Sequence, residues 1–384
     1  MQQAGPVRLG VVGPGNIGRK HIDNVVAGHV PECAITALCS RHPPDAAIAP
    51  GAQHFSSLEA LLDSGRCDAV VVATPTCNHL QAGAAVLRSG LHLMMEKPLG
   101  LSIAEGESLL AQQGPAQVFA LMLNQRTDPL FTAMRDCIDS GQLGELTRTQ
   151  WTMTNWFRPE VYFQVSDWRA TWKGEGGGLL LNQCIHNLDI YQWLCGMPAS
   201  LHAFCRFGRY HDIEVEDEVS AFFSYASGAS GVFVGSTGES PGVNRFDVIG
   251  DSGSLCFDGE RLLLTQNAQS TQQYSRTTRD MFGQPPSHSR DITPERAVNQ
   301  HAIVLDNFVQ AIRNDEPLIA PAREGLNSLA LANAMLLSSW ENTAVDLPLD
   351  AARYQQALEQ RMAVLQLRKK REINATIDMD ASFR

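Results

Sequence analysis

The sequence predicts an α/β protein with two domains, a doubly wound parallel sheet followed by an α+β domain built on an antiparallel sheet. Three observations carry this prediction: apolar strands alternate with helical segments up to about residue 123, a glycine-rich turn follows the first strand, and closely spaced strands with glycine-rich turns follow residue 145. We expect the domains at residues 1–125 and 126–350, and a C-terminal helix with a disordered tail at residues 351–384.

The composition narrows the class of protein. With 384 residues, 44% hydrophobic and 18% charged, the chain has the make-up of an ordinary soluble globular protein with room for two cores. A net charge of -11 disfavours a nucleic-acid partner, and no apolar run is long enough for a membrane span. Nine cysteines without a C-x-x-C pair indicate reduced thiols and a cytoplasmic protein. No metal site is expected, because Cys184 and His186 lack further ligands at suitable spacing.

The first element is a β-rich strand at residues 7–12, which runs directly into a turn and then a helix. The turn reads Gly13-Pro14-Gly15-Asn16-Ile17-Gly18, a G-x-G-x-x-G pattern in the context that dinucleotide binding requires. Its glycines let the backbone come close to a pyrophosphate, and the N-terminus of the following helix offers free N–H groups. A glycine-rich turn without a nucleotide is the alternative, and the strand–turn–helix context favours the nucleotide.

The second strand, residues 34–39, ends at Ser40-Arg41, where the residue that contacts the adenosine ribose is expected. An acidic residue here would accept a hydrogen bond from the 2′-hydroxyl of NAD, whereas serine and arginine do not repel a phosphate. Arg41 can pair with a 2′-phosphate, so the expected cofactor is NADP or NAD, with NADP favoured. A solvated Arg41 in an enzyme that accepts NAD is the alternative.

Two more apolar strands end at polar residues. The strand at residues 69–73 leads into Thr74-Pro75 and then His79, which is expected to start a helix and to have a structural role. The strand at residues 91–95 ends in Glu96-Lys97-Pro98, because Pro98 cannot continue the hydrogen-bond ladder. Ligands bind at the carboxyl ends of the strands in such sheets, so Lys97 is a candidate catalyst. A lysine that merely ends a strand and points to water is the alternative.

A glycine run in the second domain precedes a polar pattern. On a helix starting near Gly178, Asn182, His186 and Asp189 would share one polar face, opposite an apolar stripe that packs inward. An amide, an imidazole and a carboxylate in line are unusual for a plain core helix. A core histidine bonded to Asp189 is the alternative to a functional His186.

An aromatic segment precedes this glycine run. Four of the six tryptophans lie between residues 151 and 172, interleaved with cationic residues. Aromatic faces beside polar groups suit the C–H faces and hydroxyls of a sugar ring, and a packing cluster or subunit contact is an equal alternative. The candidates for substrate contact in this segment are Trp156, Arg158, Tyr162, Trp168, Arg169 and Trp172.

The rest of the second domain offers surface and core elements. Residues 265–300 are polar with few apolar positions, so we expect a long irregular excursion on the surface. Two amphipathic helices follow, at about residues 300–312 and 326–340. An antiparallel sheet needs its outer face covered, and a second subunit commonly does this, so a homodimer or homotetramer is expected.

Taken together, the motifs resemble one family. The turn at residues 13–18, Thr74-Pro75 before His79, Glu96-Lys97-Pro98, Asn124-x-Arg126 with Asp128-Pro129, and residues 176–189 are similar to those of the Gfo/Idh/MocA oxidoreductases, the relatives of glucose-fructose oxidoreductase and inositol dehydrogenase. The resemblance runs in order over residues 7–350. It implies an N-terminal Rossmann domain and a C-terminal domain with a large open, mostly antiparallel sheet, whose open face is commonly buried in a dimer or tetramer.

The resemblance also implies roles for particular residues. Lys97 is similar to the family's active-site lysine and His186 to its histidine after the glycine run, whereas Asn182 stands where many members have an aspartate. The Asn-Gln-x-x-His pattern resembles a subgroup that acts on sugars, glycosides and nucleotide-sugar acids. The implied cofactor contacts are Gly13, Gly15, Asn16, Ile17, Gly18, Ser40, Arg41, Thr74, Pro75, Asn78, His79, Glu96, Lys97, Asn124 and Arg126.

These observations predict an NAD(P)-dependent dehydrogenase that oxidises a secondary hydroxyl of a sugar-like ring: a sugar, anhydrosugar, glycoside or inositol. His186 is the expected general base, Lys97 polarises the reacting oxygen or shares its proton, and Asn182 holds a neighbouring hydroxyl of the substrate. A nucleotide-sugar dehydrogenase is the first alternative, for which Arg158, Arg169 and Lys173 offer cations. A non-catalytic dinucleotide-binding regulator is the second, and the presence of both Lys97 and His186 disfavours it.

Overall fold

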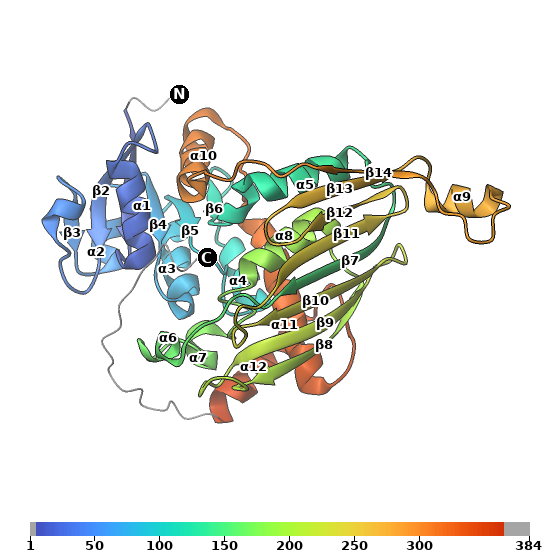
Figure 1. The fold of residues 1–384 in the computed structure, drawn as a ribbon. Coiled ribbons are helices and arrows are strands. Elements are labelled where there is room, and N and C mark those ends of the chain that lie inside the picture. The colour runs from blue at the N-terminus through green and yellow to red at the C-terminus, as the bar shows by residue number, and fades with distance from the viewer. Residues whose placement is uncertain (1–4, 365–384) are drawn as a thin grey trace.

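The computed structural model describes residues 5–364, so the expected tail beyond them lies outside the described residues (Figure 1). The first domain is a six-stranded parallel sheet in the order β3-β2-β1-β4-β5-β6. Because the order of strands reverses between β1 and β4, their carboxyl ends flank the crevice in which doubly wound sheets bind ligands.

The elements of this domain alternate as expected. Its strands are β1 (Val7–Val12), β2 (Cys33–Cys39), β3 (Gln53–Phe55), β4 (Ala69–Val72), β5 (His92–Met95) and β6 (Phe119–Leu121). Its helices are α1 (Asn16–Val26), α2 (Leu58–Leu62), α3 (His79–Arg88) and α4 (Ile103–Leu110), with the short helices η1 (Ala46–Ile48) and η2 (Thr76–Asn78) between them. β4 is buried along its whole length, which explains its continuous apolar run. The sequence did not indicate β3, because this edge strand has three residues and no apolar run.

The second domain is built on a nine-stranded sheet in the order β14-β13-β12-β11-β7-β10-β9-β8-β15. Only the β7–β10 pair is parallel among these described strands, so the prediction of a mostly antiparallel sheet is confirmed. The strands are β7 (Leu146–Met153), β8 (Ser200–Phe207), β9 (Glu216–Ser224), β10 (Ser230–Ser236), β11 (Asn244–Gly250), β12 (Gly253–Phe257), β13 (Leu262–Asn267), β14 (Ser287–Asp291) and β15 (Val345–Asp346).

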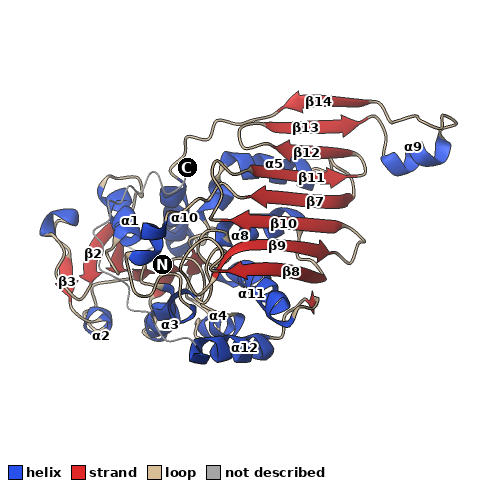
Figure 2. Ribbon diagram, turned by 60° about the horizontal axis from the view of Figure 1, so that its bottom comes forward, coloured by secondary structure: helices blue, strands red, loops and turns tan. Residues whose placement is uncertain are grey.

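Helices cover one face of this sheet, as Figure 2 shows for α5 (Pro129–Asp139), α8 (Ile185–Cys195) and α11 (Gly325–Glu341). Tyr191 of α8 packs edge-on against Phe223 of β9, and Trp151 of β7 stacks on Phe246 of β11 with ring centres 4.3 Å apart. The other face is open, where Phe204 and Phe222 are 54% and 50% exposed. α6 (Glu160–Gln164), α7 (Trp172–Glu175) and α12 (Ala351–Val364) complete this part of the chain.

Late in the chain, α10 (Gln300–Asn314) packs back on the first domain. Its buried residues Val304, Leu305 and Phe308 share a core with Leu9 of β1 and Ile22 of α1. The segment between α10 and α11, which includes η4 (Ala322–Glu324), continues this contact where Leu121 N–H of β6 donates to Ala320 O. The first domain is therefore completed by residues far beyond 125, which no local pattern in the sequence indicates.

The expected irregular excursion at residues 265–300 is in part wrong. The segment contains the end of β13, the short helix α9 (Thr271–Thr277) and β14, and it projects from the sheet as an arm (Figure 1). β14 was not recognised because its side chains are polar and all of it is exposed, as befits an edge strand. Near the tip of the arm, Met281 and Phe282 are about nine-tenths exposed.

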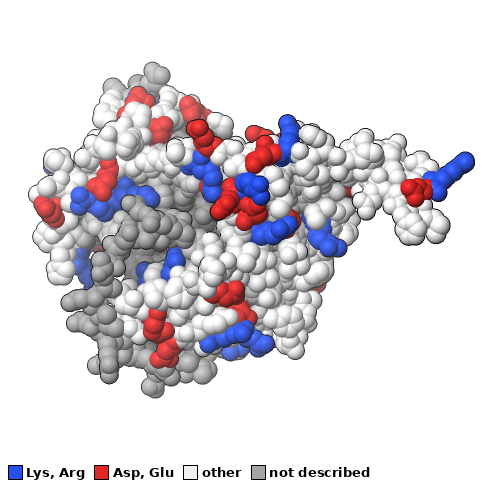
Figure 3. Space-filling view, in the orientation of Figure 1, with Lys and Arg blue, Asp and Glu red and all other residues white. Residues whose placement is uncertain are grey.

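Acidic and basic side chains are interspersed on the face of the molecule shown in Figure 3. A basic stripe of the kind that follows a nucleic-acid backbone is not seen on this face. Within residues 5–364 no helix is both long and apolar enough to cross a membrane.

Candidate active site

The glycine turn brings three backbone segments into close contact. Gly13 has a φ of 83°, a left-handed conformation that favours glycine, and a Cβ added to it would lie 2.7 Å from Ala73 O at the end of β4. A Cβ on Gly18 would collide with Gly13 O. The strand end, the first turn of α1 and the loop after β4 therefore surround one position, as the G-x-G-x-x-G pattern predicts.

This turn fits the pyrophosphate of a dinucleotide. A Cβ on Gly15 would meet no atom within 4 Å, so open space lies above it. α1, which begins with Asn16 and Ile17, has no side-chain cap and no acidic residue in its first turn, which leaves its N–H groups to a ligand. Thr74 Oγ1 is buried and has no partner among the described residues. Backbone N–H groups and a hydroxyl are the donors that an anionic bridge needs.

The loop after β2 carries the two residues expected at the ribose. Ser40 Oγ donates to His42 O across 2.7 Å, and Arg41 is exposed. The loop bears no acidic residue before Asp45, so no carboxylate at the expected position opposes a 2′-phosphate. The neighbouring Asn78 is exposed at the end of η2.

His79 holds two loops of the site together. It is buried at the start of α3, and its two ring nitrogens lie 2.9 Å from Thr74 O and 2.8 Å from Pro98 O. These contacts join the loop after β4, with Thr74 and Pro75, to the loop after β5. The expectation that His79 starts a helix is confirmed, and its contacts are structural.

Glu96 faces into the first domain rather than towards the second. Its Oε1 lies 2.7 Å from Nε2 of His21 on α1, and both side chains are buried. Burial raises the pKa of Glu96, but His21, His301 and Lys97 outweigh this effect and bring it to about 2. Glu96 is therefore a fixed negative charge directly beside Lys97.

Lys97 reaches across to the second domain. Its Nζ donates to the backbone oxygen of Asn182 across 3.1 Å. Burial lowers the pKa of Lys97, while the carboxylates of Glu96 and Glu175 act in the opposite direction. A half-buried amine held at the carboxyl end of β5 can bind or move a proton on a neighbouring oxygen. The alternative of a solvated lysine does not fit this position.

The expected helix after the glycine run is wrong at its start. Residues 176–184 form turns, and α8 begins only at Ile185. The physical reason lies in Glu216 of β9, whose buried carboxylate accepts hydrogen bonds from the N–H groups of Gly178 and Leu180 and fixes the backbone of this segment as turns. A Cβ on Gly178 would collide with Glu216 O, so only glycine allows this approach.

Of the three residues that were expected to share a face, Asn182 lies in these turns, whereas His186 and Asp189 lie on α8. Asp189 does not bond His186; it forms a buried two-bond ion pair with Arg126, with Nη2–Oδ1 2.6 Å and Nε–Oδ2 2.8 Å. Burial and the charge of Lys97 lower the pKa of His186 to about 3, so this imidazole is neutral at ordinary pH. Its Nδ1 is buried and has no partner among the described residues.

Arg126 and Asn124 were both expected at the cofactor, and the structure engages them elsewhere. The guanidinium of Arg126 is held by Asp189, by Glu324 and by Ile319 O. Asn124, in η3 (Asn124–Thr127), donates through Nδ2 to Gln300 of α10 across 2.7 Å. Arg126 is a structural link in this arrangement, because its hydrogen-bonding groups already have protein partners.

Asn182 has a buried partner that the sequence analysis missed. Its Nδ2 donates to Oε1 of Glu175 across 2.5 Å. Glu175 is 5% exposed and lies directly before the glycine run. The signal that could have found it is a carboxylate directly before the glycine run, since a glutamate that such a motif buries needs a partner.

A cavity of about 430 Å³ is lined by Lys20 of α1 together with residues of the second domain and of α10, and its lining includes Asn187, the neighbour of His186 in the chain. Four side chains that line it carry a buried amide oxygen without a partner among the described residues: Asn124, Gln125, Asn155 and Asn187. Trp151, Trp156 and Phe257 add apolar surface, and His301 joins the cavity to the charges of Glu96 and Lys97. The sequence analysis missed most of this lining, because it comes from seven separate parts of the chain.

The aromatic segment is divided between cavity and core. Trp156 lines the cavity, whereas Trp172 is 2% exposed and packs against Trp340 with ring centres 5.3 Å apart. The expectation that Trp172 contacts substrate is wrong for this reason. Arg158 and Arg169 lie over the ring of Tyr162, at 5.3 Å and 4.4 Å from its centre, and Arg169 also lies over Trp168.

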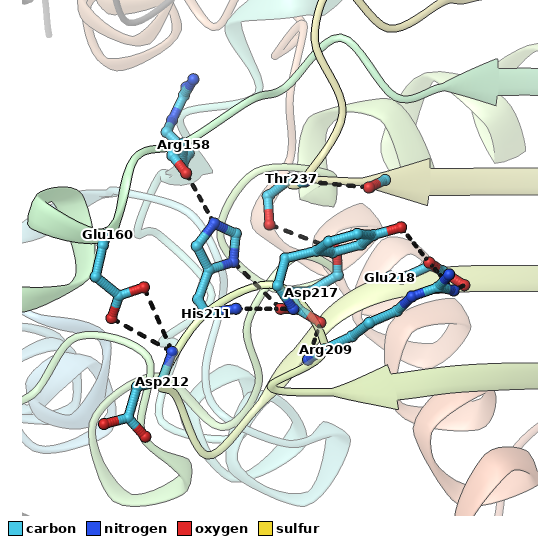
Figure 4. Close-up of polar contacts among 11 residues, drawn as sticks. Arg158, Glu160, Arg209, His211, Asp212, Asp217, Glu218 and Thr237 are labelled. Carbon is cyan, nitrogen blue, oxygen red and sulfur yellow. Dashed lines mark hydrogen bonds and ion pairs between the residues drawn. The ribbon is translucent and has the colours of Figure 1, made fainter.

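His211 ties this aromatic segment to the big sheet (Figure 4). Its Nε2 lies 2.8 Å from Arg158 O, and its Nδ1 lies 3.2 Å from Oδ2 of Asp217 on β9. Asp217 also accepts hydrogen bonds from the backbone N–H groups of Arg209, Tyr210 and His211. Since both ring nitrogens face acceptors, the imidazolium form satisfies both contacts.

The fold and the site define a class of protein: an NAD(P)-dependent oxidoreductase that acts on CH–OH groups. Residues 7–120 match the sequence model described as "Oxidoreductase family, NAD-binding Rossmann fold", and residues 131–256 match the "GFO/IDH/MocA C-terminal domain". The two models together span more than half of the chain. The protein therefore belongs to the Gfo/Idh/MocA family.

Relatives with known names resemble most of the chain. An inositol 2-dehydrogenase of Rhizobium meliloti is 27% identical, over 89% of this chain and 99% of the relative. A scyllo-inositol 2-dehydrogenase (NADP(+)), IolW of Bacillus subtilis, is 24% identical, over 77% of this chain and 83% of the relative. The WlbA dehydrogenase of Bordetella pertussis, solved with NADH and UDP-GlcNAcA, is 25% identical with a TM-score of 0.75, over 90% of this chain and all of that one.

Proposed function

We propose that the protein oxidises a secondary hydroxyl of a sugar-like ring, such as a sugar, anhydrosugar, glycoside or inositol, with NAD(P) as the hydride acceptor. The observation that supports the proposal best is a cavity lined by four side chains whose amide oxygens have no donor among the described residues, with His301, which feels the charge of Lys97, in the same lining. Hydroxyl groups are donors, and a ring with several of them would satisfy these oxygens. The size of the cavity suits one such ring with its hydration or substituents. The inositol dehydrogenases among the relatives support the same substrate class.

The chemistry assigned to the protein's own residues follows from their charges. A bound nicotinamide would supply the acceptor for the hydride of the carbinol carbon. The electron pair of the O–H bond becomes the second bond of the carbonyl, and the hydroxyl proton passes to His186, which is neutral and has a free ring position. Lys97 stabilises the negative charge that develops on the same oxygen, and Asn182 holds a neighbouring hydroxyl.

The preferred cofactor is proposed to be NADP, through Arg41. Arg41 is exposed in a loop whose expected ribose position has no carboxylate, which supports a 2′-phosphate there. Arg41→Ala should raise the KM for NADP about tenfold, the effect of roughly 1.4 kcal/mol, and leave that for NAD unchanged. Arg88→Ala, an exposed arginine on α3, is the control. Equal KM values for NADP in both variants would refute the role of Arg41.

A nucleotide-linked sugar is the alternative substrate. The paired guanidinium groups of Arg158 and Arg169 over Tyr162 support it, since two cations near one ring suit a diphosphate or a carboxylate. The WlbA dehydrogenase was solved with such a ligand. A higher kcat/KM for a UDP-sugar acid than for any free sugar or inositol would favour this alternative.

The open face of the large sheet is proposed to lie against a second copy of the chain. Phe204 and Phe222 expose apolar surface there, which a partner would remove from water. Phe222→Lys should convert the oligomer to monomers in light scattering, while Val26→Lys, at an exposed apolar residue of α1, should not. A wild-type protein that is monomeric at micromolar concentration contradicts this proposal.

The experiment that tests the function is a dehydrogenase assay over sugars, anhydrosugars, glycosides, inositols and UDP-sugars with NAD and NADP. The proposal expects reduction of the cofactor with at least one polyol. Asn155→Leu, which removes a cavity amide, should raise the KM for that polyol about tenfold or more, because it leaves a hydroxyl without its acceptor. Asn314→Leu, at an exposed position of α10, should not. Cofactor reduction with none of the compounds contradicts the proposal.

A further inference from the structure

Glu175 lies at the centre of a buried polar group behind Lys97. It is the last residue of α7, and its carboxylate accepts two hydrogen bonds, from Asn182 Nδ2 through Oε1 and from Ala170 N–H through Oε2, each across 2.5 Å. Burial raises the pKa of Glu175, and the charges of Arg169 and Lys97 act in the opposite direction. None of the chemistry assigned above to Lys97, His186 and Asn182 requires a carboxylate at position 175.

Asn182 connects Glu175 to Lys97 through both of its polar parts. Its side chain donates to Glu175, and its backbone oxygen accepts from Lys97. A carboxylate accepts only, so it can bond the NH₂ end of the amide and not the oxygen. This contact fixes the orientation of Asn182 and leaves Oδ1 as the atom that can accept from a ligand hydroxyl.

The charges that face Lys97 come from five places in the chain. Glu96 is its neighbour in the loop after β5, Glu175 is on α7, and Arg169 is in the segment before α7. His186 of α8 and His301 of α10 feel the charge of Lys97 as well, and both are neutral near pH 7. Burial and Arg169 lower the pKa of Lys97, and among these groups only the two carboxylates raise it. Glu96 already pairs with His21.

We propose that Glu175 is a positioning residue of the active site, whose carboxylate sets the protonation of Lys97 and turns the Asn182 amide so that its oxygen faces the substrate. The proposal rests on the dehydrogenase function proposed above, because a positioning role is defined relative to that reaction. Its first test does not require turnover. A merely structural Glu175, which only holds the turn at Ala170, is the competing account.

The test is an NMR titration of isotope-labelled lysine side chains in the full-length protein, with the Lys97 signal assigned from its absence in Lys97→Arg. Glu175→Gln keeps the size of the side chain and removes its charge, so the midpoint of Lys97 should fall by about one pH unit. Glu175→Gln with Asn182→Asp returns a carboxylate to the same group and should restore the midpoint. A purely structural role predicts no such rescue.

Glu216→Gln is the matched control. It neutralises another buried carboxylate, which holds the same segment through Gly178 and Leu180 but is not among the charges that act on Lys97. It should lower the melting temperature and leave the Lys97 midpoint unchanged. Where Glu175→Gln does not fold, Glu175→Asp keeps the charge but withdraws it from Asn182, and the midpoint should fall by a smaller amount.

An unchanged Lys97 midpoint in the folded Glu175 variants overturns the proposal, whatever the enzyme turns over. A lowered midpoint in a protein that oxidises no polyol supports the charge relationship and rejects the proposed function instead. In an active enzyme, the limb of the kcat–pH profile that reports Lys97 should move to lower pH in Glu175→Gln and return in the double variant.

Discussion

Nζ of Lys97 and the backbone oxygen of Asn182 lie 3.1 Å apart, although 85 positions separate the two residues in the chain. The lysine comes from the end of a strand in the dinucleotide domain, and the asparagine comes from the glycine-rich turn of the other domain. The amine of Lys97 is therefore positioned by both domains, and the cavity, which is lined by Lys20 of α1 as well as by residues of the second domain, also draws on both.

Replacement of Lys97 should abolish chemistry while the cofactor still binds. Lys97→Met should reduce kcat by about 10²- to 10⁴-fold, the usual contribution of a positioned proton-transfer group. Cofactor affinity, measured by quenching of tryptophan fluorescence, should stay near the wild-type value. Lys173→Met, at an exposed lysine two residues before Glu175, should retain full activity. A Lys97→Met enzyme with near-normal kcat would end this mechanism.

Two glycines of the turn should respond differently to alanine. Gly15→Ala places a Cβ in open space, so the fold should keep its melting temperature while cofactor binding weakens by about tenfold, or 1.4 kcal/mol. Gly13→Ala puts a Cβ 2.7 Å from Ala73 O at a left-handed φ, and should cost roughly 1–3 kcal/mol of unfolding free energy. Calorimetric cofactor binding and urea unfolding check both. Equal cofactor affinity in Gly15→Ala and wild type would show that the pyrophosphate does not bind at this turn.

His301 should make the protein less stable as the pH falls. Burial lowers the pKa of His301 from 6.5 to about 3. Between these two pH values the unfolded chain binds a proton on this residue and the folded protein does not. The stability present above pH 6.5 is thus lost as the pH falls towards 3, by about 2 kcal/mol at pH 5 for one such group. His301→Gln should flatten the urea-unfolding free energy between pH 7 and 5 by that amount, and His288→Gln, on exposed β14, should not. The same pH dependence in His301→Gln and wild type contradicts this assignment.

His211 should hold its contacts at low pH and lose them as the pH rises. Burial lowers its pKa, but the bond to Asp217 and nearby carboxylates outweigh this effect and raise it above 6.5. The tether to Arg158 O is then complete below pH 6.5 and weakens as the pH rises through the raised value. Hydrogen exchange of residues 156–165, corrected for intrinsic rates, should be slower at about pH 6 than at about pH 9. His211→Gln should remove the difference, and equal protection at both pH values in the wild type would refute the tether.

Short sequence patterns predicted the elements whose structure depends on residues close together in the chain. The glycine turn, the apolar runs of β1, β4 and β5, and the strand end at Lys97 can be read from short stretches, because burial on both faces leaves a continuous apolar run. β3 and β14 could not, since short or polar edge strands are fixed by their neighbours. The start of α8 was wrong by seven residues because Glu216, from β9, redirects the backbone before it.

The site shows the same limit. Lys97 and His186 could be proposed from their motifs and from the resemblance to the family. Asn155, Asn187 and Glu175 could not, because only the fold places them at the cavity or beside the Asn182 amide. Arg126 and Asp189 illustrate the converse, because two charged residues of the motifs prove to bind each other.

The most direct test of the account follows the hydrogen that leaves the ring. A polyol that the enzyme oxidises, deuterated at the reacting carbinol carbon, is incubated with oxidised cofactor, and the reduced cofactor is analysed by mass spectrometry. The wild-type enzyme should yield cofactor that carries the deuterium, and Lys97→Met should yield only traces at equal time. Reduced cofactor without deuterium, or equal yields from the two enzymes, would contradict hydride transfer at a hydroxyl served by Lys97.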